Sequence, residues 1–176
     1  VLRNSPEGFL MIGHTDGGPY QTVTTQRVAL MNNLIYGLSG KRTGWGGNRK
    51  GTGQLINMGL GLEDLKIHHN TVYNNEGECC LPNFLSHAWW EPNGGLDVRY
   101  NIYSYTHRDA RVGIWLGGSF EGTQALDTVW KSGTRPDYTV TENVFYRRGG
   151  DPGIYPKGNH FVDEMSAFGF DDQFQL

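Results

Sequence analysis

Residues 65–72 read Leu-Lys-Ile-His-His-Asn-Thr-Val, and this stretch carries the pattern from which the architecture can be predicted. Leu65 and Ile67 are two residues apart, as in a strand with one buried face, but the next apolar residue, Val72, comes five residues later. The alternation of inward and outward side chains therefore shifts by one residue across Asn70, which indicates two strands joined by a short bend. Asn tolerates the left-handed backbone that such a bend needs. An amphipathic helix is excluded because its apolar residues would be three and four apart.

The same pattern, apolar-x-apolar-x-x-Asn-x-apolar, occurs four times, at 28–35, 65–72, 96–103 and 138–145. Its aligned asparagines are Asn33, Asn70, Asn101 and Asn143, and we expect Asn4 to belong to the same line. Short apolar runs alternate with these copies, at 8–12, 54–56, 83–85 and 112–116. Each repeat thus predicts a strand, a turn, a strand, a bend, a short strand and a loop. Stacked repeats would align the asparagines in a ladder in which each buried side-chain amide bonds to the next.

Composition supports one all-β domain over residues 1–176, with coils over 1–147 and a closing tail over 148–176. Gly makes up 26 of 176 residues, about 15% and some twice the usual share, which favours many tight turns. The formal net charge of −3 argues against nucleic acid as a partner, because phosphate binding needs a basic face. No apolar run approaches the roughly 20 residues of a membrane helix, so no membrane partner is expected.

With these repeats the chain resembles the right-handed parallel β-helix proteins of the pectate-lyase-like group. The resemblance spans roughly residues 1–147 and implies about four to five coils. The segments 155–161, 168–172 and 174–176 are similar to the usual tail of large secreted bacterial β-helix proteins of unassigned function. Residues 121–126 are similar to the same proteins and open one short helix near 123–132. Its apolar stripe comprises Ala125, Leu126, Val129 and Trp130, with Thr123 as the cap and Gly133 as the end.

The outward positions of the aligned strands supply the candidate site. In register they form three columns: Ala29, Lys66, Asp97 and Thr139; Met31, His68, Arg99 and Thr141; and, at the edge of the bend, Asn32, His69, Tyr100 and Glu142. Coils about 4.8 Å apart would bring Lys66, His68, Asp97 and Arg99 into one polar patch. Arg or Lys can hold a uronate carboxylate, and His, Tyr or Lys can take the neighbouring proton in β-elimination. The alternative is an ordinary solvated sheet face with weak charge pairs.

We therefore take Lys66, His68 and Arg99 as catalytic candidates, and Asp97 and Tyr100 as substrate-binding candidates. Three tryptophans join the binding candidates: Trp45 in the basic, Gly-rich loop 41–53, and Trp89 and Trp90 before the turn at 92–95. Exposed Trp rings stack on sugars. The alternative is that these rings pack under neighbouring loops.

No metal site is expected, since the His residues are scattered and no CxxC pattern occurs. Ca²⁺ is the candidate cofactor, but the Asp-Gly of the 14–18 loop is more often simply a turn. The adjacent Cys79 and Cys80 allow free thiols, a vicinal disulfide or a bond to another chain. The chain also lacks the Asn-Thr-Asp, Gly-His-Gly and Arg-Ile-Lys motifs that polygalacturonases carry on this fold, and the repeat itself carries no activity.

Two functions follow as expectations. The first is a secreted, carbohydrate-interacting protein that binds, or cleaves as a lyase or hydrolase, an acidic polysaccharide. The second is a structural module that associates end to end, or that stacks on an N-terminal β-helix segment. It rests on the beginning of the chain, Val1 to Asn4, which reads as the second half of a strand. An uncapped end of a β-helix exposes apolar rungs and strand edges that must be covered.

Overall fold

The computed structural model describes residues 1–5, 8–11, 25–38, 55–58, 62–74, 85–87, 93–105, 114–116, 120–132, 135–146 and 152–162. Within these ranges most strands stack in three sheets. Sheet A contains β1 (Leu2–Arg3), β4 (Leu34–Tyr36), β7 (Thr71–Asn74), β10 (Ile102–Tyr105), β16 (Val144–Tyr146) and β17 (His160–Val162). Sheet B contains β2 (Phe9–Met11), β5 (Ile56–Met58), β8 (Leu85–His87), β11 (Ile114–Leu116) and β12 (Phe120–Glu121). Sheet C contains β3 (Thr25–Met31), β6 (Leu62–His68), β9 (Gly94–Arg99) and β15 (Tyr138–Thr141).

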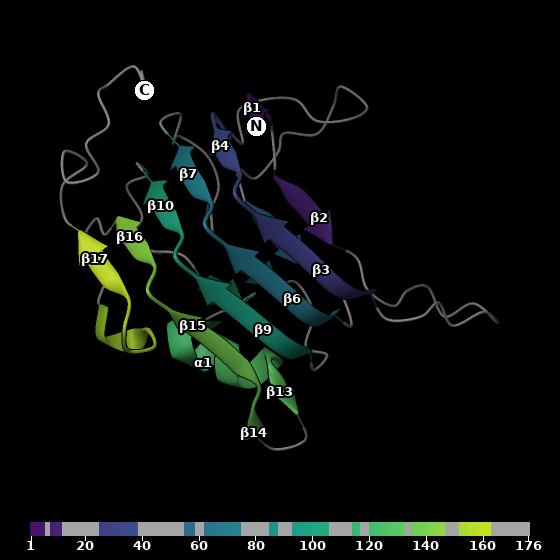
Figure 1. Cartoon of the computed structure of the whole chain (residues 1–176). Helices are drawn as coiled ribbons and strands as arrows, with labels where there is room; N and C mark the ends of the chain where they lie inside the picture. The colour runs from purple at the N-terminus through teal and green to yellow at the C-terminus, as the bar shows by residue number, and fades with distance from the viewer. Residues whose placement is uncertain are drawn as a thin grey trace.

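The chain visits the sheets in the order B, C, A and then repeats, so it winds as a parallel β-helix. Every pairing within the three sheets is parallel except that of β11 with β12. In Figure 1 the strands β3, β6, β9 and β15 lie side by side, and each leads through a bend into β4, β7, β10 or β16. The predicted all-β fold with parallel coils and one short helix is confirmed.

The core lies between the sheets and is filled by the inward side chains of each rung. On sheet C the inward column Leu65 and Leu96 and the next column Ile67 and Val98 are all buried. The expected alternation of apolar and polar positions is therefore present, with the apolar set facing inward on every rung. On sheet A, Phe145 is fully buried at the centre of an aromatic cluster.

The asparagine ladder is present and extends one rung further toward the C-terminus than predicted. The Nδ2 amides of Asn33, Asn70, Asn101 and Asn143 each donate 2.9 Å hydrogen bonds to the Oδ1 of the next rung. Each of these asparagines also donates its backbone N–H to the same Oδ1. The fifth rung is Asn159, which lies in the segment predicted as tail. The residues 159–162 therefore extend the ladder and, through β17, add a strand to sheet A.

The expected membership of Asn4 in the ladder is wrong. The register pairs Leu2 with Ile35 and Arg3 with Tyr36, so the next residue, Asn4, falls level with Gly37. Both have left-handed φ values, 54° for Asn4 and 65° for Gly37, at the bend that follows sheet A. Asn4 is itself left-handed, whereas at the ladder bends the left-handed residue is the one before each asparagine, so the two kinds of bend use Asn for different reasons.

The predicted helix is α1, Gly122–Val129, and the residues of its apolar stripe are buried. It ends three residues before the expected boundary because Trp130 leaves the helix to form a parallel bridge with Asn93. The backbone N–H of Lys131 then donates to the carbonyl oxygen of Asn93, and a hairpin follows, β13 (Lys131–Ser132) with β14 (Arg135–Pro136). A short 3₁₀ turn, η1 (Pro152–Ile154), precedes the last rung.

Candidate functional site

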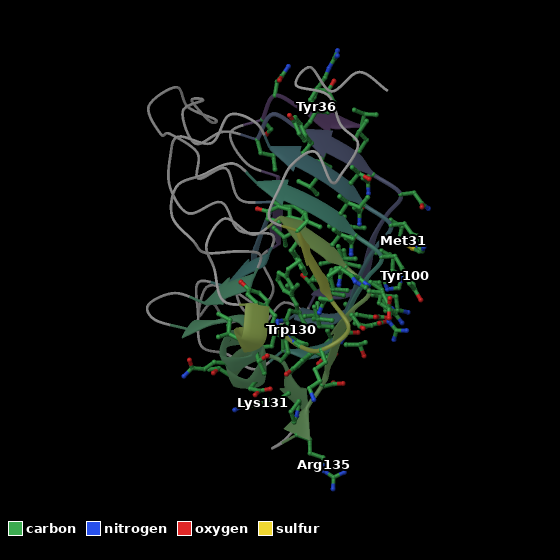
Figure 2. All side chains as sticks on the ribbon, turned by 90° about the vertical axis from the view of Figure 1, so that its left-hand side faces the viewer. Met31, Tyr36, Tyr100, Trp130, Lys131 and Arg135 are labelled. Atoms are coloured by element: carbon green, nitrogen blue, oxygen red, sulfur yellow. The ribbon has the colours of Figure 1, made fainter. Side chains whose placement is uncertain are left out.

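The outward face of sheet C carries the predicted polar columns in the predicted register. Lys66 is level with Asp97, and His68 is level with Arg99, on the neighbouring strands β6 and β9. Figure 2 shows the labelled Met31 and Tyr100 projecting from the same side of the molecule. The residues Lys66, His68, Asp97, Arg99 and Tyr100 are therefore brought together on two consecutive rungs.

Asp97 is the centre of this face. Its Oδ1 accepts a 2.6 Å hydrogen bond from Nε of Arg99, and its Oδ2 lies 3.2 Å from Nε2 of His68. Nε2 of His68 is covered by protein and makes no hydrogen bond among the described residues, so it lies near Oδ2 of Asp97 without hydrogen-bond alignment. Asp97 thus fixes the direction of the Arg99 side chain, which is 39% exposed.

Lys66 does not join this cluster. Its Nζ lies 3.6 Å from Oδ1 of Asp64 on its own strand, and both side chains are about half exposed. An exposed pair of this kind contributes little to stability, on the order of 0 to 1 kcal/mol. The sequence correctly predicted the position of Lys66 in the column but not its partner, because side-chain direction is not encoded in the spacing.

A second feature lies at the edge of the face, where each strand of sheet C ends at the bend. We call it the bend-edge row: Asn32, His69, Tyr100 and Glu142. Their φ values are 57°, 54°, 57° and 56°, and each immediately precedes a ladder asparagine. All four are exposed. The rings of His69 and Tyr100 stack with centroids 5.1 Å apart and planes at 26°, and Tyr100 is 51% exposed.

Sequence reasoning named Tyr100 as a site residue but not its neighbours in the row. His69 stands before Asn70 as Tyr100 stands before Asn101, so the repeat alignment contained the signal for this stack. Beyond Tyr100 the row continues with Glu142, whose Oε2 lies 3.8 Å from Nε2 of His160 on β17. His160 was missed because the tail was not predicted to form a rung.

The remaining candidates lie outside the described residues. These are Trp45, Trp89 and Trp90, together with the 14–18 loop and the pair Cys79 and Cys80. The binding and redox predictions for them stay predictions.

Among the described residues, no group of three or more His, Cys, Asp or Glu side chains is placed to hold a metal ion. Within the same ranges, no helix has the length and apolar character needed to cross a bilayer. The face therefore offers a guanidinium oriented by Asp97 and, from the next residue of the chain, an exposed pair of stacked rings. Such a combination can bind a carboxylate and, next to it, a flat apolar surface.

Comparisons with protein-family models, with curated proteins and with solved structures find no match to this chain. The parallel β-helix is therefore established by the strand register of the chain itself, and function is argued from the outward face of sheet C.

Proposed function

We propose that this protein is a secreted member of the pectate-lyase-like β-helix group that binds an acidic polysaccharide on the outward face of sheet C. The observation that carries the proposal is that Asp97 holds Arg99 by Nε on the residue immediately before Tyr100, whose exposed ring stacks on that of His69. Of the three guanidinium nitrogens of Arg99, only Nε bonds to a described residue, which leaves the two outer nitrogens for a ligand.

A guanidinium held in this way suits a uronate. The two outer nitrogens form a fork that matches the two oxygens of a carboxylate, and the pair adds geometry as well as charge. Because Asp97 already holds the Arg99 side chain, less rotamer entropy is lost when the ligand binds. The exposed face of Tyr100 supplies an apolar surface for the ring of the same sugar.

Binding is better supported than cleavage. β-Elimination needs a base that can reach the proton beside the carboxylate, and Nε2 of His68 is covered by protein and faces Asp97. Lys66 is more exposed but is paired with Asp64. Lys66, His68 and Arg99 stay catalytic candidates for the assay described next, with Ca²⁺ as the candidate cofactor.

The test is calorimetric titration of the protein with pectate, alginate and hyaluronan, with and without Ca²⁺. We expect at least one polymer to bind and Arg99→Ala to weaken binding at least tenfold, with weaker binding at high salt. Arg135→Ala is the matched control, because Arg135 is an exposed arginine on the hairpin at another end of the molecule (Figure 2), and it should leave binding unchanged. Binding by none of the polymers, or equal losses in both variants, would overturn the proposal.

Ultraviolet absorbance followed on the same mixtures reports new unsaturated ends. A rise abolished by Lys66→Ala or His68→Ala would add lyase activity, and no rise would exclude it for these polymers.

A second candidate function, a structural module that associates end to end, is favoured by a different observation. The inward Val28 and Leu30 of β3 are only partly buried, whereas the equivalent Leu65 and Ile67 of β6 are 1% exposed. The ladder also ends in an acceptor, because no described residue donates to Oδ1 of Asn33. The β3 edge of sheet C can therefore accept one more parallel strand.

Size-exclusion chromatography with light scattering tests this second function. An end-to-end module is expected to form oligomers whose size increases with protein concentration, because a head-to-tail contact does not close on itself. A monomer at every concentration would reject the structural function and leave the binding proposal in place.

A further inference from the structure

We infer that the bound polysaccharide lies along the coil axis over the bend-edge row, with successive sugars on successive rungs. This inference rests on the proposed function and adds the direction and the footprint of the ligand. It places the sugar that stacks on Tyr100 within reach of the guanidinium of Arg99, the preceding residue on β9.

The first support is the regular geometry of the row. Its four members have φ values within 3° of one another, and the ladder hydrogen bonds hold the residues that follow them in register. The side chains therefore leave the backbone at the same place on every rung, about 4.8 Å apart. An extended chain of sugars laid along the axis meets the same kind of position repeatedly, whereas a chain laid across the strands meets it once.

The second support is the choice of residues at these positions. The left-handed conformation is unfavourable for residues with a Cβ, and Gly or Asn adopts it most readily. The fifth rung does use a glycine, Gly158, with a φ of 85°. The rungs of His69, Tyr100 and Glu142 instead carry large polar or aromatic side chains that face the solvent. The bend requires the left-handed conformation on every rung, so what the sequence chooses at each rung is the side chain that it presents to the solvent.

The third support is the order of chemistry along the row. An amide, Asn32, is followed by the stacked rings of His69 and Tyr100, and then by the carboxylate of Glu142 next to the imidazole of His160. The rings offer a stacking surface at the centre, and groups that can hydrogen-bond to sugar hydroxyls lie on both sides. This order describes a site for an oligosaccharide that covers several rungs.

Titration with galacturonate oligomers, from the dimer to the hexamer, tests the inference. We expect affinity to rise with length until the row is covered and then to stay constant. Tyr100→Gly should weaken binding of every oligomer at least tenfold without lowering the melting temperature, because Gly relieves the left-handed strain. Asn32→Gly, at the end of the row, should weaken only the longer oligomers.

Arg27→Gly is the matched control. Arg27 is exposed, has a φ of 56°, and lies near the opposite end of its strand and two rungs from Tyr100. Its charge is screened from the row at physiological salt, where the Debye length is about 8 Å, so binding should not change. If no oligomer or polymer binds, the proposed function fails. If binding depends on Arg99 but stops increasing at the dimer, or survives Tyr100→Gly, the axial placement alone is overturned.

Discussion

Replacing Asn101 with leucine, which has the same number of side-chain heavy atoms, is expected to lower the free energy of unfolding by about 4 kcal/mol. Oδ1 of Asn101 accepts two hydrogen bonds, from the backbone N–H and from Nδ2 of Asn70. Asn70 and Asn101 are buried, so water does not replace the lost acceptor. A buried donor left without a partner costs about 1 to 3 kcal/mol, and this substitution affects two.

Asn33→Leu is the control for the ladder, because the ladder has a direction. Among the described residues no donor depends on Oδ1 of Asn33, and its Nδ2 donates to Met31 and Asn70. Oδ1 of Asn70 still accepts the backbone N–H of residue 33, so we expect a loss of only about 1 kcal/mol. Chemical denaturation of both variants measures the difference. Equal losses would mean that the ladder stabilises the fold by packing alone.

The ladder and the strand order could be predicted from the sequence because both follow from local rules. The position before each ladder asparagine is left-handed on all five rungs, so the phase of the apolar alternation slips at the same place each time. Asn159 was missed because its rung replaces the strand of sheet C by the turn at 156–158, and the apolar part of the pattern is absent. Asn4 was assigned wrongly because one residue type serves two different bends.

The sequence predicted where the residues of the candidate site lie, but not which of them form ion pairs with one another. Register placed Lys66, His68, Asp97 and Arg99 on one face, since stacked rungs leave little freedom along the strand. Which ion pairs form is decided by rotamers, and alternative rotamers of exposed charged side chains differ by little energy. The same reason explains why Asp97 binds Arg99 of its own strand while Lys66, its neighbour across the sheet, turns to Asp64.

The second large effect is expected in the aromatic cluster of sheet A. Phe145 is fully buried, and its ring centroid lies 6.4 Å from that of Tyr103, 6.1 Å from that of Tyr155 and 5.7 Å from that of Phe161. Phe145→Ala should lower the free energy of unfolding by about 4 kcal/mol, because it removes a buried ring and leaves a cavity. Denaturation followed by circular dichroism measures this loss.

Hydrogen exchange shows which strands are destabilised by this substitution, because each rung of a β-helix is stabilised mainly by the rungs next to it. Phe145 lies on β16, between β10 and β17, so its removal should speed amide exchange in both neighbours and leave β4 protected. Phe161→Ala is the matched variant, since Phe161 is a partly buried ring of β17 that contacts Phe145 and Tyr155. It should speed exchange in β17 while β10 stays as slow as in the wild type. Faster exchange along the whole sheet in both variants would instead mean that the coils unfold as one cooperative unit. Only in that case does removing one ring destabilise rungs that the ring does not contact.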